Sequence, residues 1–194
     1  MKRFAKFAGV TATALALTLF AAAEDAPRTT TANSDLIAVN AQLQHGLNAQ
    51  TAKQGDTVTA KLLQTAHLNG TTLPRNTILI GHIDEAQSSQ NDGASKIVLT
   101  FDKAKLSNGQ EVAVKATILG IYPEGTQLVI PNLNPELQVT QEPDSAHGFG
   151  LTSSVTAANS GTLSANGKNF HLSNGTELQF AVAPGSASST STGN

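Results

Sequence analysis

The strongest constraint on this chain is a series of short stretches in which apolar residues occupy every second position. Between Gly55 and Tyr122 these stretches alternate with Asn-Gly pairs and proline-containing turns. A period of two places the apolar side chains on one face of a β-strand, and Asn-Gly supplies the positive φ angles of tight hairpins. Short strands joined by such turns predict an all-β domain, a small antiparallel barrel or sandwich with hairpin connections and little helix.

The same alternation predicts where each strand lies. We expect strands over residues 37–43, 57–62, 77–84, 97–106, 111–118, 161–163, 168–172 and 178–182. The run 77–84 is apolar on both faces, which indicates a strand that is covered on both sides. Residues 87–95 are polar and should form a hairpin loop.

Turn residues separate these strands. Four Asn-Gly pairs are expected to be independent hairpin turns, because their spacing is too unequal for a repeat: 69–70, 108–109, 166–167 and 174–175. A further turn is expected at residues 73–77, where Pro74 presets one φ angle and Asn76 tolerates the left-handed conformation that follows.

The rhythm fails between residues 123 and 160. This segment contains Pro123, Pro131, Pro135 and Pro143 with little periodicity. We expect a long surface-loop excursion with one short helix near Glu136, inside a single domain that spans residues 34–182. A flexible lead-in at 24–33 and a disordered tail at 183–194, rich in Ser, Thr, Gly and Ala, should flank that domain.

The first residues have the pattern of an export signal. Lys2, Arg3 and Lys6 precede an uncharged run at 7–20, and small residues at 21–23 follow it. This pattern predicts a secretory signal peptide over residues 1–23, with a periplasmic or secreted product that contacts a membrane only while the signal is uncleaved. The alternative is a membrane anchor, for which the uncharged stretch is short. Without cysteine, the chain forms no disulfide and carries no lipid-attachment cysteine.

Charge and aromatic content limit the partners. Cleavage would remove three of the 12 basic residues and leave nine against 14 acidic ones, a formal charge of −5. This balance disfavours nucleic acid as a partner. The candidates for stacking on bases or sugars are few, and each is expected to lie in the core: Phe101, Tyr122, Phe149, Phe170 and Phe180.

The residue types of known catalytic and metal sites do not cluster along the sequence. The histidines stand at 45, 67, 82, 147 and 171, without a spacing that pairs two ligands. His82 and Asp84 share a strand face but lack a third ligand. Asp56 is followed by Thr57 and Val58 instead of the Thr-Gly of acid proteases, and Asp102 and Glu111 are expected to be solvated turn charges. We therefore expect no catalytic, cofactor-binding or metal-binding residues, and no enzyme.

Several short motifs carry a resemblance to known proteins. They are Gly55-Asp56-x-Val58-x-Ala60, Leu73-Pro74-x-x-Thr77-x-Leu79-x-Gly81, Phe101-Asp102, Asn108-Gly109-x-Glu111-Val112, Lys168-Asn169-Phe170-x-Leu172 and Gly175-Thr176-x-Leu178. The series resembles uncharacterised exported β-rich proteins of soil bacteria, especially acidobacteria-like ones. More distantly, residues 41–118 resemble the C-terminal β-barrel domain of TrbI-type scaffold proteins of conjugation and type IV secretion channels. In both groups glycine usually stands where this chain has Asn76. The resemblance implies a small barrel in the cell envelope.

These observations predict an exported, non-enzymatic envelope protein with a structural or binding role, whose partner is an unknown protein or envelope component. Its working surface should be a sheet edge open to strand addition or the excursion at 123–160. One alternative is a component of a conjugation or type IV secretion-like assembly, which would require self-association. The other is a hydrolase of envelope polysaccharide, which would require convergent carboxylates.

Overall fold

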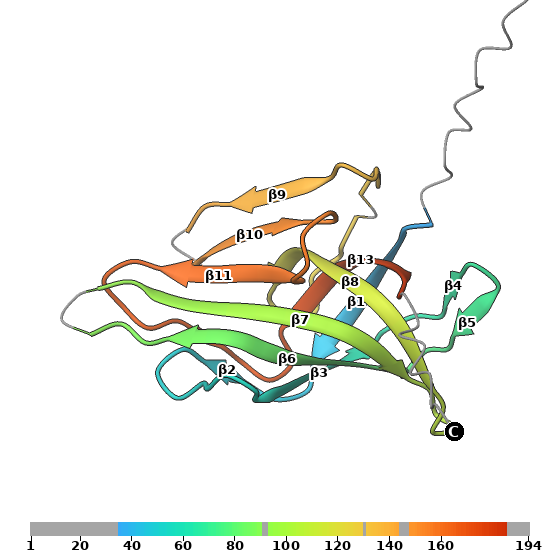
Figure 1. Cartoon of the computed structure of the whole chain (residues 1–194), viewed down its shortest axis with the longest axis horizontal. Coiled ribbons are helices and arrows are strands. Elements are labelled where there is room, and N and C mark those ends of the chain that lie inside the picture. Colours follow the sequence, from blue (N-terminus) through green and yellow to red (C-terminus); the bar gives the residue numbers. More distant parts are fainter. Residues whose placement is uncertain (1–34, 91–92, 130, 144–147, 186–194) are drawn as a thin grey trace, which may run out of the picture. The chain divides into compact units, whose positions relative to one another are not determined.

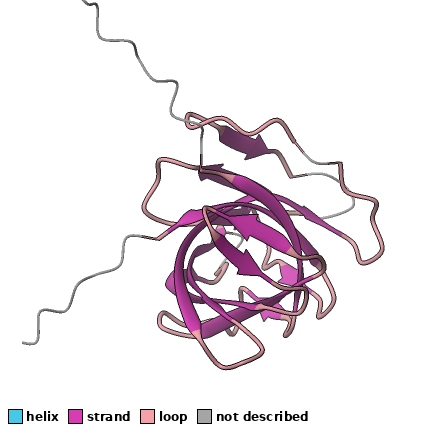
Figure 2. Ribbon diagram, turned by 90° about the vertical axis from the view of Figure 1, so that its right-hand side faces the viewer, coloured by secondary structure: helices cyan, strands magenta, loops and turns pink. Residues whose placement is uncertain are grey.

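The computed structural model describes residues 35–90, 93–129, 131–143 and 148–185. The expected signal peptide, the lead-in and residues 186–194 of the expected tail lie outside these ranges. Every regular element in the described ranges is a strand (Figure 2). No helix in the described part of the chain has the length and apolar character needed to cross a membrane.

Six strands close into an antiparallel barrel (Figure 1, Figure 2). They are β1 (Ile37–Leu43), β3 (Thr57–Leu62), β6 (Ile78–Gln87), β7 (Ser95–Lys105), β8 (Glu111–Tyr122) and β13 (Glu177–Pro184). Their order is β6-β3-β1-β13-β8-β7, and β7 pairs back onto β6 to complete the ring. The all-β prediction is confirmed, and of its two alternatives the barrel is the one observed.

Three further strands extend the sheet away from the ring, and we call them the arm: β9 (Gln138–Gln141), β10 (Gly150–Ser154) and β11 (Gly161–Ala165). They continue from β7 in the order β7-β11-β10-β9, all antiparallel. Two small pairs complete the fold, β2 (Leu47–Asn48) with β12 (His171–Leu172), and β4 (Ala66–Leu68) with β5 (Thr71–Leu73).

The alternate residues of the barrel strands fill its interior, as the period of two predicts. At the centre, the rings of Phe101 and Phe180 meet edge to face with their centroids 5.1 Å apart. Phe101 also faces Gly81 across β7 and β6, where an added Cβ would clash with the Thr100 carbonyl oxygen and would lie 2.8 Å from the Phe101 ring. Gly81 therefore makes room for this ring. Phe149 and Phe170 form a second buried pair. Tyr122 was expected in the core, but it is only half-buried.

The segment 123–160 is only in part the surface loop that we expected. It contains β9 and β10 and returns over the outer face of β13, where Leu119, Val155 and Ala181 form a second buried cluster. Leu137 and Val139 of the segment pack against this cluster. The expected helix is also wrong, because residues 134–137 form a turn in which the Asn134 side chain accepts the Glu136 N–H at 2.9 Å.

Polar bonds tie the same segment to β13. The Gln179 side-chain amide donates to the Val129 carbonyl at 2.9 Å, and the Gly125 N–H donates to the Glu177 carboxylate at 2.8 Å. Both side chains are buried, so β13 is covered on its inner and outer faces. β13 also continues past the predicted end of the domain, because Pro184 still pairs with Val114 of β8.

The turn predictions are confirmed in part. Asn69 and Gly70 have φ angles of 43° and 83° in the hairpin between β4 and β5, and Asn76 has a φ of 72°. The pair 108–109 closes the β7–β8 hairpin. The pairs 166–167 and 174–175 do not close hairpins, because β11, β12 and β13 are not paired with one another.

The strand predicted at residues 77–84 is observed as part of β6, but the prediction that both of its faces are covered is wrong. Ile78 and Ile80 lie half-buried on the outer surface of β6. The inward positions of this strand, among them Leu79 and Ile83, are fully buried. β6 is therefore covered by the barrel interior on one face and meets solvent in part on the other.

A fork in the sheet joins the arm to the barrel. The first half of β7 pairs with β11 through Leu99, and the second half pairs with β8 from Phe101 onward. Buried Ser160 sits at the branch: its hydroxyl accepts the Phe101 N–H at 2.7 Å, its N–H donates to the Leu99 carbonyl at 2.7 Å, and its carbonyl accepts the Ile118 N–H at 2.8 Å. The hydroxyl of Ser153 donates to the Ile118 carbonyl. Two serines thus supply the bonds that a neighbouring strand would otherwise make.

Replacing the branch hydroxyl should destabilise the fold. Ser160→Ala leaves the buried Phe101 N–H without an acceptor, and we expect the free energy of unfolding to fall by about 1–3 kcal/mol. Urea denaturation measures it. Ser164→Ala on β11 is the matched control, because this exposed serine makes no side-chain hydrogen bond within the described residues. Equal stability of the two variants would contradict the account of the branch.

Candidate functional site

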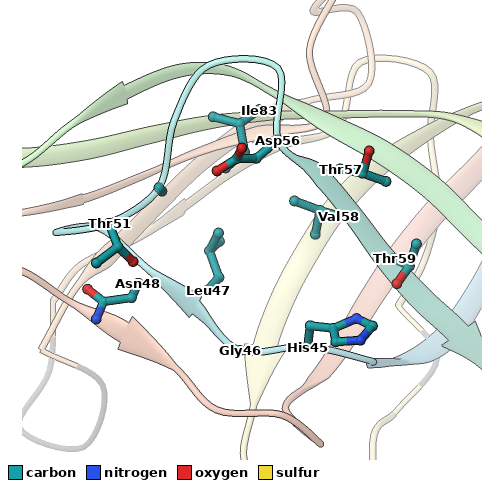
Figure 3. Close-up of a pocket in the computed structure, with 11 residues that line it drawn as sticks. His45, Gly46, Leu47, Asn48, Thr51, Asp56, Thr57, Val58, Thr59 and Ile83 are labelled. Atoms are coloured by element: carbon teal, nitrogen blue, oxygen red, sulfur yellow. The ribbon is translucent and has the colours of Figure 1, made fainter.

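A small pocket lies between the β1–β2 connection and the start of β3 (Figure 3). Leu47, Val58 and Ile83 form an apolar floor, and polar residues from the loop surround it. The pocket measures about 130 Å³. Small-molecule sites are usually ~300 Å³ or more, so this pocket suits water or one inserted side chain.

The polar groups around this pocket already serve the loop. The Asp56 carboxylate accepts the Lys53 N–H at 2.9 Å, and the Asn48 side-chain oxygen accepts the Gln50 N–H at 2.9 Å. Both bonds close local turns. The arrangement shapes the β2–β3 connection, and Asp56, the one carboxylate in the pocket lining, has a structural partner.

A second hollow of about 200 Å³ lies where β8 ends, and Tyr122, Pro123, Phe149 and His171 contribute to its lining. The lining contains no carboxylate. Neither pocket therefore presents the two facing carboxylates that glycoside hydrolysis ordinarily uses.

His82 and Asp84 do share a face of β6, as the sequence indicates, and Thr100 of β7 joins them. The carboxylate accepts the Thr100 hydroxyl at 2.6 Å and lies 3.0 Å from the imidazole Nε2. In a nucleophilic triad the imidazole stands between the hydroxyl and the carboxylate. Here the carboxylate stands between the other two, so the imidazole has no direct path to the hydroxyl proton, and the group links β6 to β7 on the barrel surface.

The other residues considered from the sequence lie apart. Glu111 of β8 pairs with Lys105 of β7. Lys105 lies three residues beyond Asp102 along β7, so the carboxylates of Asp102 and Glu111 do not face one another. His147 lies outside the described residues. No group of three or more His, Asp or Glu side chains in the described ranges has the geometry to hold a metal ion.

The open edge of the arm is the feature that sequence reasoning located least well. β9 is the last strand of the sheet (Figure 1). The Val155 N–H donates to the Leu137 carbonyl, and bonded pairs alternate along an antiparallel ladder. Val139 and Gln141 therefore bond towards β10, whereas the backbone groups of Gln138 and Thr140 point away from it.

Two N–H and two C=O groups are thus presented at this edge, and no other described residue bonds to them. The alternation of Leu137, Val139 and Gln141, half-buried between the exposed Gln138 and Thr140, was the available sequence signal. The prolines on both sides of this short stretch obscured it.

One buried group lacks a partner. The hydroxyl of Thr77, which is 1% exposed, makes no hydrogen bond to any residue of the described ranges. Its backbone is bonded normally, to Pro74 and Leu62. The hydroxyl lines neither pocket, so we interpret it as a local cost to stability.

Two threonine variants should shift stability in opposite directions. Thr77→Val keeps the shape and removes the unpaired hydroxyl, so we expect the free energy of unfolding to rise by about 1 kcal/mol. Thr100→Val is the matched control, because it removes a hydroxyl that is bonded to Asp84 and should lower stability. Chemical denaturation of both variants measures the effects, and a loss of stability in Thr77→Val would show that its hydroxyl has a partner.

No protein-family profile, curated protein sequence or solved structure matches this chain. A proposal about function therefore rests on the geometry described above and on the sequence.

Proposed function

We propose that this chain is an exported, non-enzymatic protein of the cell envelope with a binding role, and that the edge of the arm is its working surface. The observation that carries the proposal is the contrast between barrel and arm. The barrel closes on itself and pairs its own strands, whereas β9 presents unpaired backbone groups on a strand that its inward side chains hold in place. Strand addition to such an edge is a common mode of peptide recognition.

Natural sheets usually protect their edges with charges, prolines or bulges. The four residues of β9 contain none of these: Gln138, Val139, Thr140 and Gln141. Val139 packs against both buried clusters. This packing sets which side chains of β9 face inward. An anchored edge whose own four residues carry no charge and no proline supports a binding role for the arm.

The export part of the proposal is tested in the cells that produce the protein. We expect the signal peptide to be removed after Ala23, because small residues precede that bond, and the processed protein to occur in the periplasm or the medium. Fractionation followed by mass spectrometry of the N-terminus measures both. An unprocessed protein confined to the cytoplasm would contradict export.

A second candidate is a component of a conjugation or type IV secretion-like assembly. Its support is the closed barrel formed by a chain whose residues 41–118 resemble the barrel domain of TrbI-type scaffolds. Such a role requires copies of the chain to associate. A polysaccharide hydrolase is not favoured, since no observation above brings two carboxylates together.

Light scattering after size-exclusion chromatography separates the two candidates. A binding protein of the envelope should elute as a monomer, because the barrel interior is already filled and needs no second copy. The chain has a mass of 20.0 kDa with its leader, so a monomer and a ring of copies are easily resolved. A stable oligomer of defined size would favour the assembly candidate instead.

A further inference from the structure

We propose that the edge of β9 binds an extended segment of another polypeptide, in which basic residues six positions apart flank an alternating, uncharged centre. This inference rests on the proposed binding role of the arm and specifies the chemistry of the partner.

The backbone of β9 sets the length of the contact. Gln138 and Thr140 each present one N–H and one C=O on the open side of β9, so a partner strand gains four hydrogen bonds over three residues. Leu137 and Val139 face inward and pack against the cluster that includes Ala181. Apolar residues of the partner that lie opposite them would extend that cluster, whereas the residues between would face solvent.

The side chains at the ends of the strand are acidic. Glu136 and Glu142 are both exposed and lie six residues apart, Glu136 in the turn just before β9 and Glu142 just after its last residue. Opposite charges across a strand pair stabilise it, and like charges directly opposite one another destabilise it. A partner with lysine or arginine opposite each glutamate therefore fits, and the acidic balance of the chain favours the same partner.

A second copy of this chain fits poorly. Symmetric antiparallel pairing of two β9 strands that uses all four free groups places Gln138 opposite Thr140 of the other copy. The same register brings the exposed Glu136 of each copy towards the exposed Glu142 of the other at both ends of the pair, so like charges meet. No two basic residues of the sequence lie six positions apart, so no other segment of the chain carries the expected pattern either. The occupant is therefore a different polypeptide.

Synthetic peptides test the proposal directly. The probe is a fluorescently labelled heptapeptide, Lys-Val-Thr-Val-Thr-Val-Lys with blocked ends, and the comparison peptide has Glu in place of both Lys. Fluorescence anisotropy with the purified exported protein at low ionic strength measures binding. We expect the Lys-ended peptide to bind about tenfold more tightly, since two cross-strand charge pairs change from repulsive to attractive.

Variants locate the contact. The double variant Glu136→Lys/Glu142→Lys should reverse the preference and bind the Glu-ended peptide more tightly. The control double variant Asp102→Lys/Glu111→Lys makes the same charge change on the β7–β8 hairpin and should leave the preference as it is. Thr140→Pro should abolish binding of both peptides without lowering Tm, because its N–H points to the open side and makes no bond within the described residues.

The outcomes separate this inference from the proposed function. Equal binding of both peptides, or unchanged binding to Thr140→Pro, would overturn the edge as the basic-peptide site while leaving the export result intact. Dimerisation that rises with protein concentration and disappears in Thr140→Pro would also overturn it, because a second copy would then occupy the edge.

Discussion

The structure depends on the hydrogen bonds of Ser160 at the point where the sheet branches. A strand in a continuous sheet has one neighbour on each side, but β7 changes its neighbour from β11 to β8 between Leu99 and Phe101. The change would leave buried N–H groups without acceptors, and each such group costs about 1–3 kcal/mol. Ser160 removes this cost through one side-chain and two backbone bonds. Because these bonds are satisfied, one sheet both closes into a barrel and extends into an arm.

The arm has two consequences for the rest of the molecule. The segment that leads from β8 to β9 covers the outer face of β13. Without this cover, Glu177 and Gln179 would be solvated polar residues on an exterior face. The arm also gives the nine-stranded sheet an open edge at β9. A closed barrel removes edges, so the nine-stranded sheet has an edge at β9 because it branches. Stability and the proposed binding role thus share one structural cause.

The barrel was predictable from sequence because its signals are local. The strand at residues 37–43 has the predicted bounds, and Asn69 and Asn76 adopt the positive φ angles that their neighbours suggested. Val58, Leu99 and Val114 each occupy an apolar position in the alternation of their own strand. All three are buried, as that alternation predicts.

The arm was not predictable because its cause is not local. β10 consists of Gly, Leu, Thr and two Ser residues, and its buried Ser153 satisfies its hydroxyl through a bond to β8. Nothing in the sequence near Ser160 distinguishes it from the other serines of its segment. The same holds for the candidate site, since an edge strand is defined by which neighbour it lacks. The order of strands in the sheet decides which strand lies at the edge, and local patterns in one sequence do not reveal that order.

Amide hydrogen exchange, resolved by residue, tests whether the bonds of Ser160 complete the branch. If Ser160 completes the branch, the N–H groups of Phe101 and Ile118 are bonded and buried, and they should exchange only with global unfolding. The N–H groups of Gln138 and Thr140 on the open edge should exchange rapidly under the same conditions. Fast exchange at Phe101, comparable with that at Thr140, would contradict the account.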